Sequence, residues 1–326
     1  MRLQERLARM RITVLAGGIG GSRFLLGLRT LGHDITVIGN NGDDITLFGL
    51  RVCPDLDTVM YTLGDGISAE RGWGREDESF RLKDELVAYG TGPAWFGLGD
   101  LDLATHIART MWLREGVGLD EVTRRLCERW QPGVRLLPST NDEVETHVTL
   151  DDGSTVHFQE WWVRLHAEVP AREIRLRNAE QARPAPGVID AITGCDVLVL
   201  PPSNPVVSVG TILAVPGIAE AVRATAAPVV GVSPIIADAP VRGMADACLT
   251  AIGVETSAYA VASHYGARSA GGVIDGWLVD DTDAATADKL SAEGVRSRAV
   301  PLWMTDVAAT ADIATAALEL AAELRR

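Results

Sequence analysis

Residues Ile12–Gly39, with the sequence ITVLAGGIGGSRFLLGLRTLGHDITVIG, decide the fold of this 326-residue chain. The segment opens with an apolar run that predicts a buried strand, and the glycine-rich turn Gly17–Arg23 follows directly. Phe24–Leu31 has the apolar spacing of a helix that stops at Gly32, and Ile35–Gly39 predicts a second buried strand. Short apolar strands joined by a helix pair in parallel, so this segment predicts the first unit of an α/β sheet.

The same alternation returns from residue 188 onward, and the Ala- and Leu-rich stretch Asp306–Leu324 predicts the last helix. The predicted strands of this part are Asp196–Leu200, Ala227–Val232, Ser257–Val261, Gly276–Val279 and Arg298–Trp303. The whole pattern predicts a doubly wound, mainly parallel, Rossmann-like α/β fold. Ligands of such folds bind at the carboxyl ends of the strands.

We predict that a helical insertion interrupts the core. Between the two α/β parts, helical spacing replaces the strand pattern, and Gly and Pro residues separate the helical runs. The predicted helices are Asp55–Leu63, Phe80–Ala88, Leu103–Leu113 and Leu119–Trp130.

A β-hairpin is predicted at residues 145–166, where Asp-Asp-Gly joins two β-rich runs. Trp161 and Trp162 are neighbours on its second run, so we expect them to face opposite sides and one of them to lie in the core. The polar, Pro-bearing stretch Glu173–Gly187 is interpreted as a connector. The predicted segments are an exposed lead-in at 1–10, the first part of the α/β core at 11–60, the helical insertion at 61–135, the hairpin and connector at 136–187, and the second part of the core at 188–326.

Composition narrows the class of function. The chain has 44 acidic and 30 basic residues and a formal net charge of −14, which argues against binding to nucleic acid or to an anionic membrane. A small phosphorylated ligand stays compatible, because backbone amides or a metal ion bind phosphate locally. No apolar run reaches membrane-spanning length without charge or proline. The four cysteines form no CxxC pair and no zinc spacing, and nothing in the sequence suggests a disulfide. We therefore expect a cytoplasmic protein with reduced thiols.

A cluster of carboxylates follows the second strand. The stretch NNGDDITLFGLRVCPDLDTVMY, residues 40–61, contains Asp43, Asp44, Asp55 and Asp57. Loops after parallel strands face the ligand crevice, and Mg²⁺ prefers oxygen ligands and substrate phosphates. We therefore predict a Mg²⁺ site at these four carboxylates; the alternative is a solvated acidic loop.

The glycine-rich turn after the first strand suits a phosphate. Its glycines, Gly17, Gly18, Gly20 and Gly21, let backbone amides approach an anion in front of a helix N-terminus, and Arg23 offers an anion contact. The turn is not the dinucleotide fingerprint, because Arg23 stands where the third glycine is required, and it lacks the Lys-Ser/Thr of a P-loop. The alternative is a tight turn without a ligand.

Two more segments carry polar groups that suit a ligand. Ser203 and Asn204 of the PPSNP loop, followed by Ser208, offer uncharged donors and acceptors for phosphate, ribose or base, unless the loop is only a rigid strand-to-helix turn. The stretch WFGLGDLDLATH offers a glycine-rich backbone against which a flat aromatic ligand can rest. Its candidate site residues are Gly99, Asp100, Thr105 and His106, although an isolated histidine is more often structural.

In combination, these motifs resemble the 2-phospho-L-lactate transferase family of coenzyme F420 biosynthesis. The resemblance extends over nearly the whole chain, and the Trp-Trp hairpin and the chain length resemble the actinobacterial branch. The motifs that carry it, in chain order, are LAGGIGGSRFLLGL, NNGDDITLFGLRVCPDLDTVMYTL, GWG, WFGLGDLDLATH, RLLPST, HFQEWWVR, PPSNPVVSVG, SPIIA and RGMAD.

The resemblance implies a reaction that the residues alone do not reveal. A guanosine-diphosphate-activated three-carbon acid, lactyl-2-diphospho-5′-guanosine or its enolpyruvyl counterpart, is the donor. Its phospho-acid unit passes to the terminal hydroxyl of the deazaflavin Fo, GMP leaves, and Mg²⁺ assists. The resemblance also implies a homodimer.

The resemblance further implies roles for the motif residues. The glycine-rich turn with Ser203, Asn204 and Ser208 lies near the guanine nucleotide, and Gly99–His106 in the helical insertion lies on the acceptor side. Among the carboxylates, Asp43 is the first choice and Asp57 the second for a catalytic residue that touches the metal or the Fo hydroxyl. Asn41-Gly42 departs from the Ile-Gly pair that we expect in the family, which affects substrate detail more than the reaction.

Two other functions compete with this one. The first is a nucleotide-dependent oxidoreductase of Rossmann type, against which the missing third glycine and the absent ribose-binding acid argue. The second is a non-catalytic nucleotide-binding protein, for which Asp43→Asn and Asp57→Asn would leave ligand binding and biological effect intact.

Overall fold

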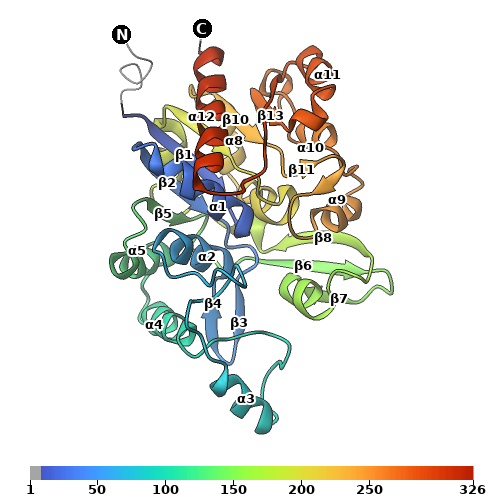
Figure 1. Ribbon diagram of the computed structural model, residues 1–326. Helices are drawn as coiled ribbons and strands as arrows, with labels where there is room; N and C mark the ends of the chain where they lie inside the picture. The colour runs from blue at the N-terminus through green and yellow to red at the C-terminus, as the bar shows by residue number, and fades with distance from the viewer. Residues whose placement is uncertain (1–8, 326) are drawn as a thin grey trace.

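The computed structural model describes residues 9–325, and a seven-stranded parallel sheet forms its core (Figure 1). In spatial order the strands are β14 (Arg296–Ala299), β13 (Gly276–Val279), β10 (Val229–Val232), β9 (Val197–Leu200), β1 (Arg11–Ala16), β2 (Asp34–Gly39) and β5 (Arg135–Pro138). From β1 the chain builds the sheet outward through β2 to β5, then returns to place β9 on the other side of β1. The direction of growth therefore reverses between β1 and β9, and a ligand crevice opens at such a switch point.

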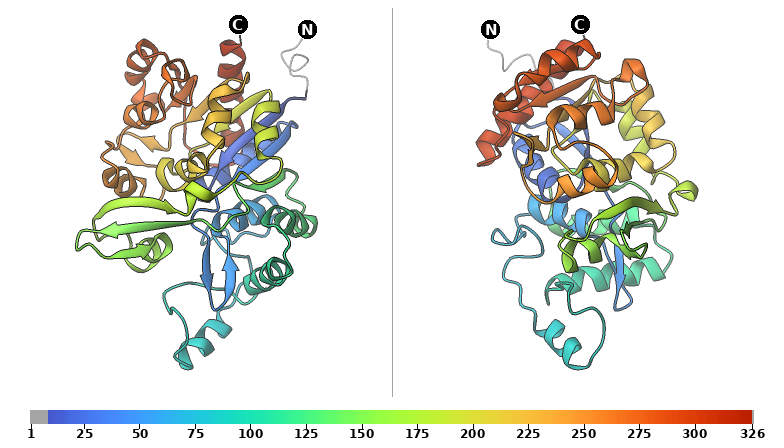
Figure 2. Two further views of the ribbon diagram at one scale, coloured as in Figure 1. Left: turned by 180° about the vertical axis from the view of Figure 1, so that it is seen from behind. Right: turned by 90° about the vertical axis from the view of Figure 1, so that its right-hand side faces the viewer.

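Helices cover both faces of the sheet, which confirms the doubly wound α/β fold (Figure 2). Alternate strand residues supply the two cores: Val14 faces one core and its neighbour Leu15 faces the other. One face packs against α1 (Gly18–Thr30), α2 (Pro54–Leu63), α5 (Leu119–Trp130) and α12 (Val307–Leu324). The other packs against α6 (Val188–Gly194), α7 (Gly210–Ala214), α8 (Ile218–Ala224), α9 (Ala245–Ala251), α10 (Ala258–Tyr265) and α11 (Thr286–Ala292).

The helical insertion extends away from the sheet and is drawn at the bottom of Figure 1. It contains α3 (Arg81–Ala88) and α4 (Asp102–Arg114), followed by α5, so the helices expected there are confirmed to within two residues. The acidic segment, however, is not a plain loop. It includes a short antiparallel hairpin of β3 (Ile45–Leu47) and β4 (Leu50–Val52), whose three-residue strands are too short for a periodic signal.

A second, three-stranded antiparallel sheet has the order β7–β6–β8. β6 (Glu145–Leu150) and β7 (Thr155–His157) form the expected hairpin. The connector predicted at Glu173–Gly187 is wrong in its first part, because β8 (Ala171–Arg177) pairs with the other side of β6. Its polar residues are compatible with a strand, since none of the residues of β8 is buried.

The second run of the predicted hairpin, which contains both tryptophans, does not continue as a strand. Residues Glu160–Arg164 form a single π-helical turn, so Trp161 and Trp162 do not alternate across a sheet. Trp161 is nevertheless fully buried and donates from Nε1 to the carbonyl of Val169, which confirms that one of the pair lies in the core.

Three other predictions differ from the structure. The strand expected at Ser257–Val261 is α10, because the Ser257 side chain caps the helix by accepting from the amide of Ala260 and the following residues are Ala-rich. The strand expected at Arg298–Trp303 begins and ends earlier, at β14. β5 was not predicted; it lies across the border between the predicted insertion and hairpin segments. Most of the predicted lead-in, residues 1–8, lies outside the described residues.

Within residues 9–325, the membrane-span criteria of length and apolar composition are met by no individual helix. They are met only jointly by the segments Pro205–Ala214 and Ile218–Ala224, which are bent by 88°.

Candidate active site

Three segments that are far apart in the sequence meet at the carboxyl ends of β1 and β9. Ser203 Oγ donates to the carbonyl of Gly17 at 2.8 Å and accepts from its amide at 3.2 Å. A Cβ atom on Gly17 would collide with the side chains of Asp55 and Ser208, and one on Gly21 would collide with Ser203 Oγ. The glycine-rich turn, the acidic segment and the PPSNP loop therefore form one site, as the strand-end positions predict.

Protein packing accounts for part of the glycine pattern. Only Gly17 separates β1 from α1, which begins at Gly18. The glycine-rich stretch is therefore the first turn of α1, whereas the sequence suggested a separate loop. A Cβ on Gly20 would collide with the carbonyl of Pro202. Gly18 has a φ of 65°, in the region that glycine adopts at little cost.

Asn40 connects the acidic residues of this site. Its side-chain Nδ2 donates to Asp43 Oδ1 at 2.6 Å and to Asp55 Oδ2 at 2.9 Å, so it holds the two carboxylates side by side. Its Oδ1 accepts from Thr211 Oγ1 at 2.7 Å, which fixes the orientation of the amide. The second oxygen of Asp43 accepts from Gln159 Nε2 at 3.1 Å.

Asp43 and Asp55 are buried without a counter-ion. Both are less than 10% exposed, and among residues 9–325 neither forms an ion pair with an Arg, Lys or His. Burial raises the pKa of Asp55 to about 6, and burial together with the charges of Asp55 and Asp44 raises the pKa of Asp43 well above its usual value. Two neighbouring buried carboxylates need either protons or a cation. Mg²⁺ prefers oxygen ligands, so these two carboxylates are chemically suited to hold the predicted metal ion.

The other two acidic residues each have a basic partner. Asp57 pairs with Arg109 of α4, and Asp44 lies 3.9 Å from Arg51 Nε. Asp55 and Asp57 have different neighbours because side chains two residues apart on a helix point in directions about 200° apart. Asp55 therefore faces the glycine-rich turn, while Asp57 on the same helix α2 faces α4.

Asp44 is nevertheless part of the acidic environment. Its side chain is fully buried, and neither of its oxygens has a hydrogen-bond partner among the described residues. Burial raises its pKa to about 7, although Arg51 opposes the shift. Asp44 adds negative potential next to Asp43 and can contribute an oxygen to a bound cation.

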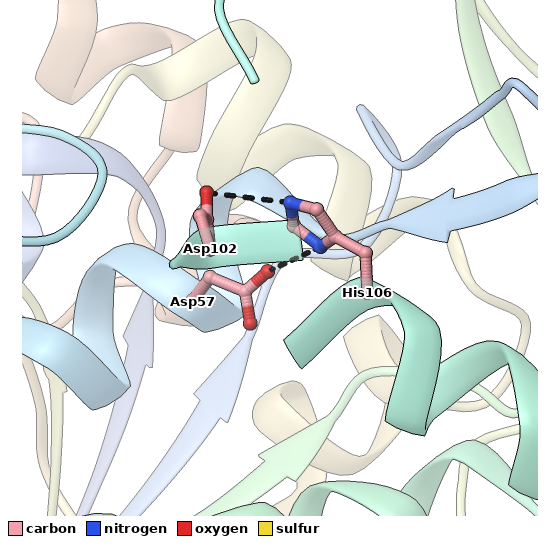
Figure 3. Close-up of side chains that lie close together, drawn as sticks. All are labelled: Asp57, Asp102 and His106. Carbon is pink, nitrogen blue, oxygen red and sulfur yellow. Dashed lines mark ion pairs between the residues drawn. The ribbon is translucent and has the colours of Figure 1, made fainter. Parts of the chain in front are cut away.

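A buried network surrounds Asp57, and Figure 3 shows its central three residues. His106 lies between two carboxylates: Nε2 is 3.3 Å from Asp102 Oδ2, and Nδ1 is 3.7 Å from Asp57 Oδ2. Tyr61 donates to Asp102 Oδ1 at 2.6 Å and is 2.8 Å from Thr105 Oγ1. Burial would raise the pKa of Asp102, but its hydrogen bond with His106 and the charge of His106 lower it.

This network is the second place where a cation can be considered, since Asp57, Asp102 and His106 offer ligand atoms within 4.8 Å of one another. Arg109, however, already contacts Asp57 and lies 3.2 Å from His106 Nδ1. A guanidinium in that position neutralises the carboxylate and repels a metal ion. The network is therefore better suited to hold α2 against α4 than to bind Mg²⁺.

Three predicted site residues have local packing or capping contacts. Asp100 is a half-exposed residue that accepts from Ser79 Oγ and the amide of Leu82, which anchors the start of α3. Gly99 packs against the carboxylate of Glu78, where a Cβ would collide. Asn204 uses Oδ1 to cap the turn Pro205–Val209 through the amides of the second and third residues of that turn.

Several residues of the site were not predicted. Arg109 lies three residues after His106 on α4, so helical spacing was a signal that could have revealed it. Asn40 directly follows β2, and the strand-end rule that drew attention to the aspartates applies equally to it. Gln159 comes from a distant segment, and although it lies in the HFQEWWVR motif, its sequence position did not indicate that it reaches Asp43.

Comparison with known proteins agrees with this geometry. A family model described as 2-phospho-L-lactate transferase CofD matches residues 12–315, which includes every residue of the site. The chain belongs to the CofD family. This family acts on phosphorylated three-carbon acids in coenzyme F420 biosynthesis, so the transferase class expected from the motifs is confirmed.

Curated CofD relatives are similar over almost the whole chain. A protein of Streptomyces griseus named phosphoenolpyruvate transferase is 64% identical over 97% of this chain and 100% of its own length. Proteins of the same name from Thermobifida fusca and a Mycobacterium species are 59% and 52% identical, covering 97% and 96% of this chain and 99% of each relative.

Solved structures support the fold. A crystal structure of BH3568 from Bacillus halodurans, described as a UPF0052 family member, superposes with a TM-score of 0.61 at 19% identity, over 96% of this chain and 99% of that one. A second structure of BH3568 gives a TM-score of 0.63 at 20% identity, over 95% of this chain and 100% of that one. These likenesses confirm the α/β architecture.

Proposed function

We propose that this CofD-family chain transfers a phosphoenolpyruvyl or 2-phospholactyl unit from a guanosine-diphosphate-activated donor to the terminal hydroxyl of the deazaflavin Fo, with release of GMP. The observation that carries the proposal is the Asp43–Asp55 carboxylate pair beside the N-terminus of α1. Phosphoryl transfer needs stabilisation of charge on the phosphoryl oxygens, and this corner offers a cation site and helix amides together.

Mg²⁺ is the metal that we propose for the site. Asp43 and Asp55 would hold it, with Asp44 as a third oxygen source. A bound Mg²⁺ neutralises the charge that develops on the transferring phosphoryl group. Without the metal, these carboxylates would repel the donor phosphates, so metal and donor binding are expected to depend on each other.

The donor nucleotide is proposed to lie over the carboxyl ends of β1 and β9. Ser203 ties the two strand ends together, and the amides of the first turn of α1 suit a diphosphate. The two strands are adjacent and in register, so both ends present their loops at the same height. The enolpyruvyl donor is favoured over the lactyl one because the similar proteins of Streptomyces griseus and Thermobifida fusca are named phosphoenolpyruvate transferases.

The acceptor Fo is proposed to approach from the helical insertion. Trp73 packs against Gly97, and Trp95 lies edge-on to Phe96, so this side offers aromatic groups for a flat ring system. The buried Asp57–His106–Asp102 network fixes α4 behind these loops. Asp43, one of the two proposed metal ligands, is also the residue that we propose to orient or deprotonate the attacking hydroxyl.

A homodimer is proposed from the surface of the insertion. No residue of α3 is buried, and an isolated helix of this length is unstable in water. The exposed apolar side chains of α3 and α4 and their flanks, with the exposed fraction of each, are Leu82 (44%), Val87 (45%), Tyr89 (79%), Leu101 (40%), Ile107 (46%) and Met111 (57%). A second copy of the chain that covers both helices would stabilise α3.

The decisive test of the function is a product assay. Purified protein with Fo, Mg²⁺ and each candidate guanylyl donor should yield the phosphoenolpyruvyl or phospholactyl derivative of Fo together with GMP, both identified by mass spectrometry. Formation of neither product with either donor would contradict the proposal.

A further inference from the structure

Arg23 and Arg242 lie beside the start of α1, and neither has an acidic partner among residues 9–325. Ile19 and Arg23 are four residues apart and share one face of this helix. Arg242, in the loop between β12 (Ala239–Pro240) and α9, lies next to that face. A Cβ on Gly72 would be 2.9 Å from Arg242 Nη2 and 3.4 Å from Ile19 Cδ1. Gly72, Arg242 and Ile19 therefore lie close together.

The charges of the two arginines are uncompensated. Among residues 9–325, neither Arg23 nor Arg242 forms an ion pair, although the chain has 44 acidic residues for 30 basic ones. Burial and the charge of Arg23 lower the pKa of Arg242. Both side chains are exposed, so water and salt weaken the repulsion between them, and the pair is open to an anion from solution.

The loop that carries Arg242 is held in place. Arg242 Nη2 donates to the carbonyl of Arg71 at 3.4 Å, and Val241 donates from its amide to the carbonyl of Pro234. Trp162, from the π-helical turn, packs 3.3 Å from where a Cβ on Gly243 would stand. Arg242 belongs to the RGMAD motif. Neither the proposed metal site nor the phosphate-binding turn involves this motif.

We propose that Arg23 and Arg242 bind the carboxylate of the donor's three-carbon acid. The inference rests on the proposed function, in which Asp43, Asp55 and the amides of α1 hold the phosphates. The remaining anionic group of the donor is then its carboxylate, and guanidinium groups recognise carboxylates through paired hydrogen bonds. Arg23 is five residues after Gly18, about 7.5 Å along the helix axis, which is a reasonable span for a three-carbon acid joined to a phosphate.

The test compares ligands that differ in the carboxylate. Phosphoenolpyruvate carries it, whereas ethyl phosphate has the phosphate monoester without it, and GDP reports on the nucleotide site. With Mg²⁺ present, calorimetry should show wild-type protein binding phosphoenolpyruvate at least tenfold more tightly than ethyl phosphate. Arg23→Gln and Arg242→Gln should each weaken phosphoenolpyruvate about tenfold, while affinity for ethyl phosphate and GDP stays within twofold.

The control is Arg183→Gln, which alters an exposed arginine that forms no ion pair among the described residues; it should leave all three affinities unchanged. Thermal melting checks that each variant is folded. The proposal is overturned if wild-type protein does not prefer phosphoenolpyruvate, if both variants keep that preference, or if they weaken all three ligands equally. Failure of the proposed function is seen separately, as absence of turnover by wild-type protein with both guanylyl donors.

Discussion

At the scale of single residues, the four aspartates of the acidic segment have two different tasks. Asp43 and Asp55 share the amide of Asn40 and have no basic partner among residues 9–325, whereas Asp44 and Asp57 lie near Arg51 and Arg109. The sequence predicted the cluster because it follows a strand, but it could not separate the members. Their separation depends on which way each side chain points from α2 and from the loop before β3.

Substitution of the free pair should abolish activity while the fold survives. Asp43→Asn and Asp55→Asn remove a metal ligand, so transfer should fall by about 100-fold or more. In EDTA at pH 7.5 both variants should melt at a higher temperature than wild type, because each removes a carboxylate whose pKa burial has raised. Unchanged turnover in both variants would contradict their role, and melting curves provide the second measurement.

Asp57 should behave differently, because Arg109 balances its charge. Arg109→Gln leaves Asp57 buried without its guanidinium partner and should lower the free energy of unfolding by about 3 kcal/mol. The double variant with Asp57→Asn should recover part of that loss, which urea denaturation of all four proteins measures. A double variant no more stable than Arg109→Gln alone would show that the pair is not coupled.

The pH dependence of stability has a defined sign. In the metal-free folded protein, burial raises the pKa of Asp55 from 3.8 to about 6 and that of Asp44 to about 7. Between pH 4 and 7 the folded state thus retains protons that the unfolded chain has lost, so this contribution to stability falls as pH rises. We expect the melting temperature in EDTA to decrease from pH 5 to pH 7.5, and Mg²⁺ to offset the decrease at the upper end.

The Asp55→Asn variant is the control for that titration. It should show a shallower decrease in EDTA and a smaller gain from Mg²⁺ than wild-type protein. A wild-type melting temperature that rises steadily over the same range in EDTA would be inconsistent with buried carboxylates that retain protons.

At the scale of secondary-structure elements, prediction succeeded where a strong period was present. α5 and β13 were predicted to the residue, and α12 was predicted with its capping residue Asp306. Failures occurred where tertiary contacts outweigh local pattern. β8 is polar because both of its faces are partly exposed, and α10 looked like a strand because it is apolar, although Ser257 caps it as a helix.

The exposed face of the insertion gives a prediction at this scale. If a second copy covers α3, then Leu82→Asp combined with Val87→Asp should convert a dimer into a monomer, measured by light scattering after gel filtration. The matched control is Val307→Asp, which changes a side chain of equal exposure, 45%, at the start of α12. A monomeric wild-type protein, or a dimer unaffected by the α3 changes, would contradict the proposed interface.

At the scale of the whole molecule, the position of the site follows from topology. The sequence predicted the strand–helix–strand unit and the return of the α/β pattern, and these two facts place the glycine-rich turn and the PPSNP loop at the carboxyl edge. The order β9–β1–β2–β5 was not accessible, because β5 lacked a sequence signal and strand pairing depends on long-range contacts. The sequence alone could not show how closely the glycine-rich turn and the PPSNP loop approach each other.

The central claim is that the carboxylate pair at this switch point holds the divalent cation. A crystal of the protein grown with Mn²⁺ and GDP, and measured at the manganese absorption edge, tests it most directly. The account predicts an anomalous peak about 2.0–2.3 Å from oxygens of Asp43 and Asp55, next to the diphosphate. A peak between Asp57, Asp102 and His106 instead, or a diphosphate bound away from the first turn of α1, would contradict it.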